Sequence, residues 1–176
     1  QPFATPNAIR TEVAQVRVVD LEDGSKVTLG ARSKVDLRLS DAERRVVLDA
    51  GEAFFDVAHR ADQPFVVVAG ETRVIVTGTR FNVKRIGQRV RVTVLEGSVR
   101  VVSARADQMV RETRLEAGQQ VLAEPAAALE PELVLASEPG SWREGRLSYQ
   151  DAPLSEIVAD INRYRTKPVR IAGDTL

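Results

Sequence analysis

The sequence contains no cysteine, one histidine and one tryptophan. Without cysteine the chain has no disulfide, no thiol nucleophile and no thiolate metal site. A single histidine supplies too few nitrogen ligands for a zinc centre, and no acidic loop has the spacing of a calcium site. We therefore predict no metal and no cofactor. The compartment stays open, because cysteine-free proteins occur on either side of a membrane.

The sequence also lacks net charge and long apolar runs. Its 176 residues include 25 basic and 25 acidic side chains. These are interspersed, as on a solvated surface, without the basic patch of a nucleic-acid-binding protein. We therefore predict no nucleic-acid partner. No segment approaches the roughly 20 apolar residues that span a bilayer, so we predict no membrane span in these residues.

The N-terminus, Gln1-Pro2-Phe3-Ala4, resembles neither an initiator region nor a signal peptide. We expect the chain to be part of a longer protein. Residues 1–12 are predicted to be a disordered lead-in.

β-Strand patterns dominate residues 13–123. Apolar and polar residues alternate with a period of two in Lys34–Leu39 and Arg89–Val94, which predicts strands with one buried and one solvated face. Glycine-containing turns separate these short segments. The fold class is therefore mainly β, as an antiparallel β-sandwich or a solenoid-like wrap. The other predicted strands are 26–29, 45–48, 52–57, 65–68, 73–77, 80–84, 98–102, 111–115 and 119–123.

A Leu-acidic-x-Gly pattern recurs along this region. It occurs in Leu21–Val27, Leu48–Phe54 and Leu115–Val121, with a shortened copy in Leu95–Val99. Glycine supplies a positive φ between two strands. Because the spacing is irregular, the pattern indicates recurring strand–turn–strand chemistry and not a true repeat. Asp23-Gly24 in the first copy is typical of a type I′ hairpin turn.

The composition changes after residue 123. Residues 124–141 are rich in proline and alanine and are predicted to be a linker, with one short strand at 133–135. Apolar residues then recur at helical spacing, which predicts an amphipathic helix with Pro153 in its first turn. Strands are predicted on either side, at 146–149 and 169–171. The tail, 142–176, is therefore predicted to be a small β-α-β unit. The apolar helical positions are Leu154, Ile157, Val158 and Ile161.

Few residues are arranged for catalysis. His59 follows a predicted strand without the nucleophile-elbow serine of a hydrolase, so we interpret it as a surface histidine. Glu52 and Asp56 lie on one face of a predicted strand. Paired carboxylates can act as acid and base in a glycosidase, although such pairs are also common on solvated strands. We predict no enzyme; a glycosidase is the enzymatic alternative and requires a deep cleft.

Phe54 and Phe55 are adjacent on a predicted strand, so their side chains point to opposite faces. Either one ring is half exposed as a contact site, or the sheet is packed on both faces. Packing on both faces is the favoured interpretation.

Several linked motifs resemble the FecR family. The first, Leu21–Leu29, contains Asp-Gly-Ser, and the second, Arg45–Val57, is an arginine-led strand that runs into Gly-Glu-Ala-x-Phe. Pro64–Val67, Gly78–Val83 and Val92–Val99 follow in the family's order. Each motif alone is weak, but together they make a specific match.

The tail resembles the start of the family's C-terminal piece, which is similar to the secretin/TonB short N-terminal (STN) domain. The resemblance rests on Trp142 with Gly145, Leu147 and Tyr149, then Pro153-Leu154 and Asn162–Tyr164. It implies that 142–176 is a partial STN-like unit that follows the FecR-like β domain.

The resemblance implies the periplasmic sensing region of a single-pass inner-membrane anti-sigma regulator. FecR-like proteins hold or assist an extracytoplasmic-function sigma factor through a short cytoplasmic segment. They sense the signalling domain of an outer-membrane TonB-dependent transporter loaded with a ferric siderophore or similar nutrient. We expect the sigma-factor contact to lie in a cytoplasmic segment outside these residues. The non-enzymatic alternative is a structural or glycan-binding envelope module.

The tail is also where we predict partner binding. Strand addition at an edge such as 169–172 is one route, with main-chain hydrogen bonds giving affinity. The polar helix face, which includes Asn162, is expected to set specificity. The predicted contact residues are Asp160, Arg163, Tyr164, Arg165, Val169 and Ile171.

Overall fold

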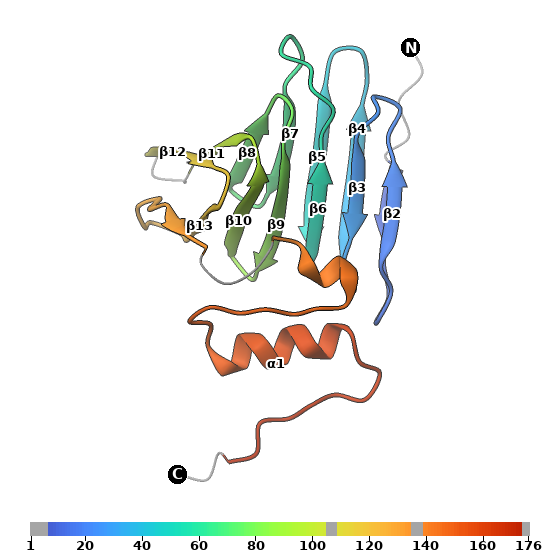
Figure 1. Ribbon diagram of the computed structural model, residues 1–176, viewed down its shortest axis with the longest axis vertical. Helices are drawn as coiled ribbons and strands as arrows, with labels where there is room; N and C mark the ends of the chain where they lie inside the picture. The colour runs from blue at the N-terminus through green and yellow to red at the C-terminus, as the bar shows by residue number, and fades with distance from the viewer. Residues whose placement is uncertain (1–6, 105–108, 135–138, 174–176) are drawn as a thin grey trace.

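The computed structural model describes residues 7–104, 109–134 and 139–173, and these form a β-sandwich with a C-terminal segment against it (Figure 1). Within these residues, sheet A has the strand order β1-β4-β5-β7-β8-β11-β12. Sheet B has the order β14-β13-β10-β9-β6-β3-β2. Paired neighbours are antiparallel except β5 and β7, which are parallel. The prediction of a mainly β sandwich is confirmed.

The strand bounds show how closely the two sheets alternate along the chain. Sheet A contains β1 (Asn7–Arg10), β4 (Lys34–Leu39), β5 (Arg44–Ala50), β7 (Phe65–Ala69), β8 (Thr72–Val76), β11 (Ser98–Ala104) and β12 (Val110–Glu116). Sheet B contains β2 (Arg17–Asp20), β3 (Lys26–Leu29), β6 (Glu52–Asp56), β9 (Arg80–Ile86), β10 (Arg89–Glu96), β13 (Gln119–Ala123) and β14 (Glu132–Leu133). From β2 to β14 the chain makes two strands in one sheet and then crosses to the other, except that β6 is a single strand of sheet B between β5 and β7.

The recurring glycine pattern marks corners between the sheets. Gly51 lies between β5 and β6, Gly97 between β10 and β11, and Gly118 between β12 and β13, and each has a φ of 82°. Only glycine adopts this conformation without steric cost. The pattern therefore recurs because the fold needs the same sharp corner three times.

The core lies between the two sheets. Phe55 stacks on Phe81 with ring centroids 5.1 Å apart, and meets Phe65 edge-on at 6.2 Å. Buried valines from both sheets surround these rings. The period-two alternation of the strands thus places one apolar face of each sheet inward.

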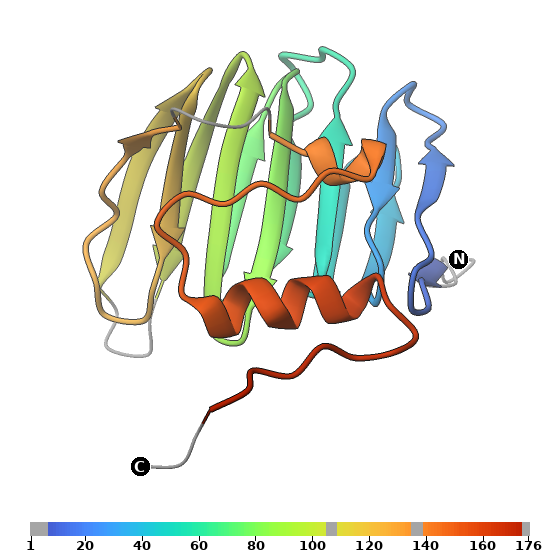
Figure 2. The same ribbon diagram turned by 60° about the horizontal axis from the view of Figure 1, so that its bottom comes forward.

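The outer face of sheet B is also covered. Phe54 is buried on this side, beneath the segment that contains the 3-10 helix η1 (Ser141–Glu144). Figure 2 shows this segment crossing the strands of sheet B before the chain turns into α1 (Leu154–Arg163). The favoured interpretation, packing on both faces, is confirmed for the strand that carries Phe54 and Phe55.

Three expectations about secondary structure need correction. Residues 7–10, expected in a disordered lead-in, form β1, because Ile9 packs on the core beside Val35 and Thr11 bonds to Gly30 and Ser33. Residues 17–20, which have little apolar alternation, form the edge strand β2. The short strand expected at 133–135 needs no such correction: 132–133 pairs with β13, and residue 135 lies outside the described residues.

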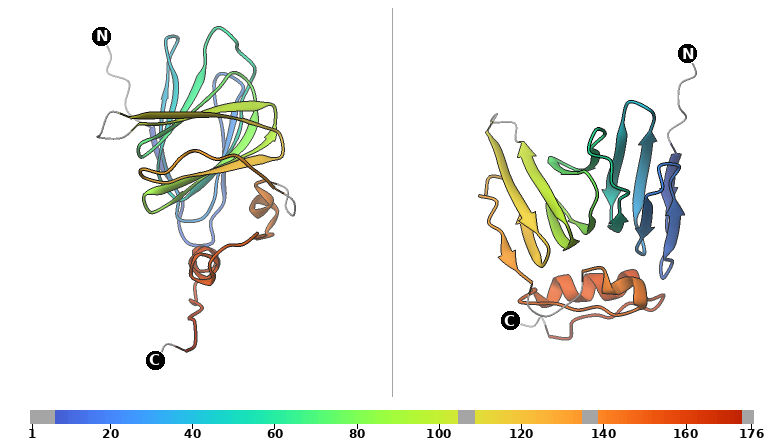
Figure 3. Two further views of the ribbon diagram at one scale, coloured as in Figure 1. Left: turned by 90° about the vertical axis from the view of Figure 1, so that its left-hand side faces the viewer. Right: turned by 45° about the horizontal axis from the view of Figure 1, so that its top comes forward.

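The third correction concerns the tail. Residues 146–149 and 169–171, both within the described chain, have no strand structure, so the predicted β-α-β unit is a single helix between extended segments. The physical reason is that neither segment lies beside a strand that it can pair with. Both views of Figure 3 place α1 across the ends of the strands and the C-terminal segment beyond it.

Candidate functional site

The helix α1 turns its charged side towards the sandwich. Glu156 and Asp160 are 8% and 6% exposed. Leu154, on the apolar side, is 59% exposed, and the remaining apolar helical positions are half-buried. This arrangement is the reverse of an ordinary surface helix, which buries its apolar stripe against the core.

Three charged residues on sheet B form a row beneath α1. Glu52 on β6 lies opposite Lys84 on β9, and Lys84 lies opposite Arg91 on β10. Neighbouring strands are about 4.8 Å apart. The row therefore presents one charge per strand along a line perpendicular to the strands.

The charges of α1 match this row one strand at a time. Arg163 Nη1 lies 3.2 Å from Glu52 Oε2, Asp160 pairs with Lys84, and Glu156 Oε1 lies 2.7 Å from Arg91 Nη1. Steps of three and four residues along a helix rise about 4.5 and 6 Å, close to the strand spacing. We name these six residues the charge ladder: Glu52, Lys84, Arg91, Glu156, Asp160 and Arg163.

Arg163 is the most heavily bonded member of the charge ladder. Its guanidinium donates to the backbone carbonyl of Ala31, with Nε at 3.0 Å and Nη2 at 2.8 Å. Burial lowers the pKa of Arg163, but Glu52, Tyr164 and Asp160 raise it by more, so it rises overall. A Cβ on Gly30 would lie 3.2 Å from Nη2 and 2.8 Å from the Tyr164 hydroxyl. Glycine at position 30 therefore allows this end of α1 to reach the sheet.

Two tyrosines border the charge ladder. The Tyr149 hydroxyl donates to Asp160 Oδ2 at 3.2 Å. Burial and the charge of Asp160 raise the pKa of Tyr149. Burial and the charge of Glu52 raise the pKa of Tyr164 to about 12. Both phenols therefore stay neutral at physiological pH, and Tyr149 serves as a hydrogen-bond donor to Asp160.

Trp142 fixes the preceding segment at a second point. Its indole Nε1 donates to Asn82 Oδ1 at 3.0 Å, and Asn82 Nδ2 donates to Glu52 Oε1 at 2.8 Å. Arg143 lies over the Phe54 ring at 3.6 Å. A cavity of about 100 Å³ remains between this segment and sheet B, lined in part by Asn82, Lys84 and Tyr149. Its walls carry both charge signs, so they favour no single class of ligand.

The structure separates the predicted contact residues into two groups. Asp160, Arg163 and Tyr164 face the sandwich, and the charges of Asp160 and Arg163 already have partners within the chain. The segment that follows α1 and contains Arg165, Val169 and Ile171 runs on the side of the helix away from the sandwich (Figure 2). The role of both groups in partner binding stays a prediction.

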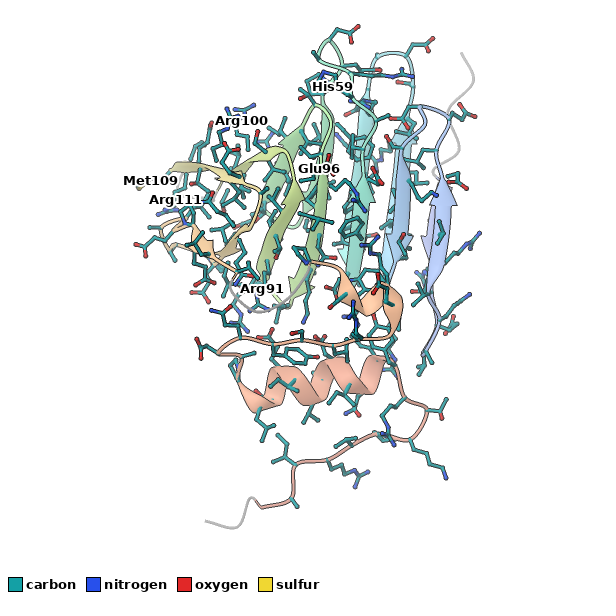
Figure 4. All side chains as sticks on the ribbon, viewed as in Figure 1. His59, Arg91, Glu96, Arg100, Met109 and Arg111 are labelled. Carbon is teal, nitrogen blue, oxygen red and sulfur yellow. The ribbon has the colours of Figure 1, made fainter. Side chains whose placement is uncertain are left out.

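The residues weighed for catalysis lie apart. Glu52 is committed to Asn82 and Arg163 beneath the C-terminal segment, whereas Asp56 is exposed and pairs with Arg80. His59 is exposed in the loop after β6, away from the charge ladder (Figure 4). Within the described residues, no group of three or more histidine, cysteine or acidic side chains is placed to hold a metal ion.

The Asp-Gly-Ser motif has a structural role at the opposite end of the sandwich. Asp23 Oδ2 accepts from Arg44 Nη1 at 3.0 Å and from Ser25 Oγ at 2.8 Å. Arg44 also donates to the carbonyls of Ala58 and Gln63. Burial raises the pKa of Asp23, but hydrogen bonds from Ser25 and Arg44 outweigh it, so the pKa falls below its ordinary value. The loop has five residues, so it is longer than the predicted two-residue turn.

Sequence reasoning missed Lys84, Arg91 and Asn82. Lys84 and Arg91 are charged residues at outward positions of valine-rich strands, which is also the pattern of a solvated sheet face. One signal was present: Glu156, Asp160 and Arg163 recur at helical spacing opposite the apolar stripe. Which surface this second stripe meets depends on tertiary structure.

The comparison with family models matches residues 7–100 to FecR, described as FecR protein. The chain belongs to the FecR family. The match covers the strands from β1 into β11, including Glu52, Lys84 and Arg91. Membership supports a regulatory role, which is consistent with a site made of matched charges.

Two crystal structures share this architecture, each of a candidate anti-sigma factor from Parabacteroides distasonis ATCC 8503. The first, at 2.50 Å resolution, has a TM-score of 0.78 at 25% identity and covers 91% of this chain and 75% of that one. The second, at 1.65 Å, has a TM-score of 0.77 at 25% identity, with coverages of 90% and 74%. Comparison with curated proteins gives no match. Among the described residues of this FecR chain, no helix has the length and apolar character to cross a bilayer.

Proposed function

We propose that this chain is the periplasmic signal-sensing region of a FecR-family anti-sigma regulator. It binds the signalling domain of an outer-membrane TonB-dependent transporter and thereby controls an extracytoplasmic-function sigma factor for iron or siderophore uptake. In this proposal a cytoplasmic segment of the full-length regulator holds the sigma factor. Family membership and the two anti-sigma structural neighbours support the regulator role.

The observation that carries the binding role is the apolar side of α1. Leu154 is 59% exposed, and the half-buried Ile157, Val158 and Ile161 continue its stripe along the helix. Ile171, in the segment after α1, is 52% exposed. The charge ladder fixes α1 in this orientation. An apolar surface that is held outward by specific contacts on its other side is typical of a protein-interaction site.

The segment after α1 offers main-chain hydrogen bonds beside that surface. Asn162 donates to the Val169 carbonyl at 2.9 Å and accepts from the Val169 amide at 2.7 Å, which holds the segment close to the helix. Among the described residues, 170–173 make no backbone–backbone hydrogen bond. A strand from a partner can pair with them and place its side chains on α1.

The charges at the rim indicate the partner's character. Arg165, Lys167 and Arg170 are exposed around this segment. They favour a partner that presents carboxylates around an apolar strand, because complementary charge raises the rate of association and selects among partners. We propose that the transporter's signalling domain presents such an edge.

Calorimetric titration of this chain with the purified signalling domain of the transporter encoded beside its gene tests the proposal. We expect saturable binding that Leu154→Asp weakens at least about tenfold, because apolar anchors dominate interfaces. An acidic residue in the first helical turn favours the helix dipole, so the substitution does not disfavour α1 itself. Arg80→Gln, on the exposed end of sheet B, is the matched control.

Each outcome has a distinct meaning. Equal affinity for Leu154→Asp and the unchanged chain would move the binding site away from α1. No binding by a chain that circular dichroism shows to be folded would reject the sensing role. That result would favour the structural or glycan-binding envelope module instead.

A further inference from the structure

The contacts that hold α1 differ in kind from those that hold the sandwich. The core cluster, as described, draws no member from residues 139–173. Among the described residues, one backbone–backbone hydrogen bond joins α1 to the sandwich, from the Ala14 amide to the Arg163 carbonyl at 2.9 Å. The remaining attachment is the charge ladder and the side-chain bonds of its members.

Trp142 makes a second attachment, and its partner Asn82 neighbours the charge ladder through Glu52. Trp142 is buried and bonds to Asn82, and its neighbour Gly140 packs against the Phe54 ring. Residues 146–153 connect this point to α1 and are mostly exposed, without helix or strand. The C-terminal segment therefore has two attachments, one largely apolar and one ionic, and the residues between them contact the charge ladder through the Tyr149 hydroxyl.

We propose that the charge ladder is an ionic latch: α1 leaves sheet B as a unit by pivoting on residues 146–153, while Trp142 and the sandwich stay in place. Taking charges out of water costs nearly as much as their attraction returns, so the docked state is favoured by a small margin. A helix of ten residues is marginal in water on its own. Release therefore frays α1 as well as freeing it.

The charge ladder gives the latch its register. Because each strand contributes one charge, shifting α1 by one strand in one direction would place Asp160 against Glu52, and shifting it the other way would place Arg163 against Lys84. Like charges in contact oppose such a shift. The latch therefore closes in one position, with the apolar stripe outward, and this holds whether or not a transporter is the partner.

Hydrogen exchange by mass spectrometry on a double-mutant cycle tests the latch. Lys84→Met removes the buried cation that pairs with the carboxylates of Asp160 and Glu156. Asp160→Leu removes the anion nearest to Lys84. Each single variant should speed exchange in peptides that cover 154–164 at least about tenfold. The double variant, with an apolar pair in place of the ion pair, should return it to within about threefold of the unchanged chain.

Trp142, the one tryptophan of the chain, distinguishes release of α1 from unfolding. In all variants its emission maximum and the exchange of β6 and β10 peptides should remain unchanged. The proposal is overturned if the single variants leave 154–164 protected, or if the double variant exchanges as fast as the singles. A Trp142 shift in step with α1 exchange would overturn it too, because the two attachments would then be one cooperative unit.

Discussion

The inner face of sheet B is covered by apolar side chains, whereas the part of its outer face beneath α1 is covered by charged ones. β6 shows both: Phe55 points into the aromatic core, and Glu52 points outward into the charge ladder. Burial of apolar surface is strong and non-directional, whereas matched buried charges add little net stability but penalise every other arrangement. The inner face therefore stabilises the fold of the sandwich, and the charged outer face determines where the C-terminal helix lies.

The largest expected effect comes from removing an inner-face ring. Phe55→Ala should lower the free energy of unfolding by about 3–5 kcal/mol, because it leaves a cavity between Phe65 and Phe81. Urea denaturation followed by far-UV circular dichroism measures it. Val18→Ala, at an exposed position of β2, should change it by less than about 0.5 kcal/mol. A loss below about 1 kcal/mol for Phe55→Ala would contradict the aromatic core.

Arg44 tests whether a buried charge can hold the sandwich as well as a ring does. Arg44→Met should cost about 3–5 kcal/mol, because it leaves the buried Asp23 carboxylate without its cation. The matched control is Arg45→Met on the same strand, whose partly exposed pair with Glu43 is worth under about 1 kcal/mol. If urea denaturation shows that both variants lose less than about 1 kcal/mol, the buried pair of Arg44 and Asp23 does not stabilise the sandwich.

The pH dependence of stability sharpens the same comparison. The pKa of Asp23 is lowered in the folded state, so its contribution is present above the unfolded value, near 4. It is lost as the pH falls through the folded pKa. Asp23→Asn should therefore reduce the stability difference between pH 7 and pH 3. An unchanged difference in urea titrations at the two pH values would assign acid sensitivity to other carboxylates.

A smaller effect is expected where the C-terminal segment meets Phe54. Gly140 has a φ of 76°, and a Cβ there would lie 2.5 Å from Phe54 Cδ2. Gly140→Ala should expose Trp142 and shift its fluorescence emission to the red. Gly145→Ala has nearly the same φ, 77°, but meets nothing within 4 Å, so it costs about 1 kcal/mol of strain and leaves the emission unchanged. Equal spectra for both variants would argue against the contact with Phe54.

The smallest effect is expected in the exposed charge row of sheet B. Arg80 lies between Asp56 and Glu96 at 3.4 and 3.7 Å, with all three side chains well exposed. Arg80→Gln should change the free energy of unfolding by less than about 1 kcal/mol. This exposed row thus differs from the buried charge ladder on the same face of sheet B. A loss of more than about 1 kcal/mol in urea denaturation would show that the exposed charges also stabilise the fold.

The sequence predicted the sandwich well and the position of the tail poorly. The alternation of apolar and polar residues in strands such as Lys34–Leu39 is a local consequence of burying one face, so the sequence alone predicts these strands. The edge strands β1 and β2 were not predicted, because their own apolar pattern is weak and pairing with neighbouring strands stabilises them. The helix α1 was predicted from its apolar stripe, but nothing local reveals that the charged side faces inward.

The orientation of the predicted contact residues on α1 could not be read from the sequence. Asp160 and Arg163 were predicted as contacts to a partner, but in the structure they pair within the chain. Their partners, Lys84 and Glu52, are 76 and 111 residues away in the chain. Pairing at such separation is set by the packing of the whole fold. The exposed Arg165 and Ile171 were open to prediction because they need no partner within the chain.

Native-state hydrogen exchange of the unaltered chain across a range of urea concentrations tests the account most directly. Amides of α1 should exchange through a local opening with a small urea dependence and a free energy well below that of β6 and β10. That result would show that matched charges hold the helix while the apolar core holds the sandwich. If α1 and the core strands share one opening free energy and one urea dependence, the two regions are a single unit and the account is contradicted.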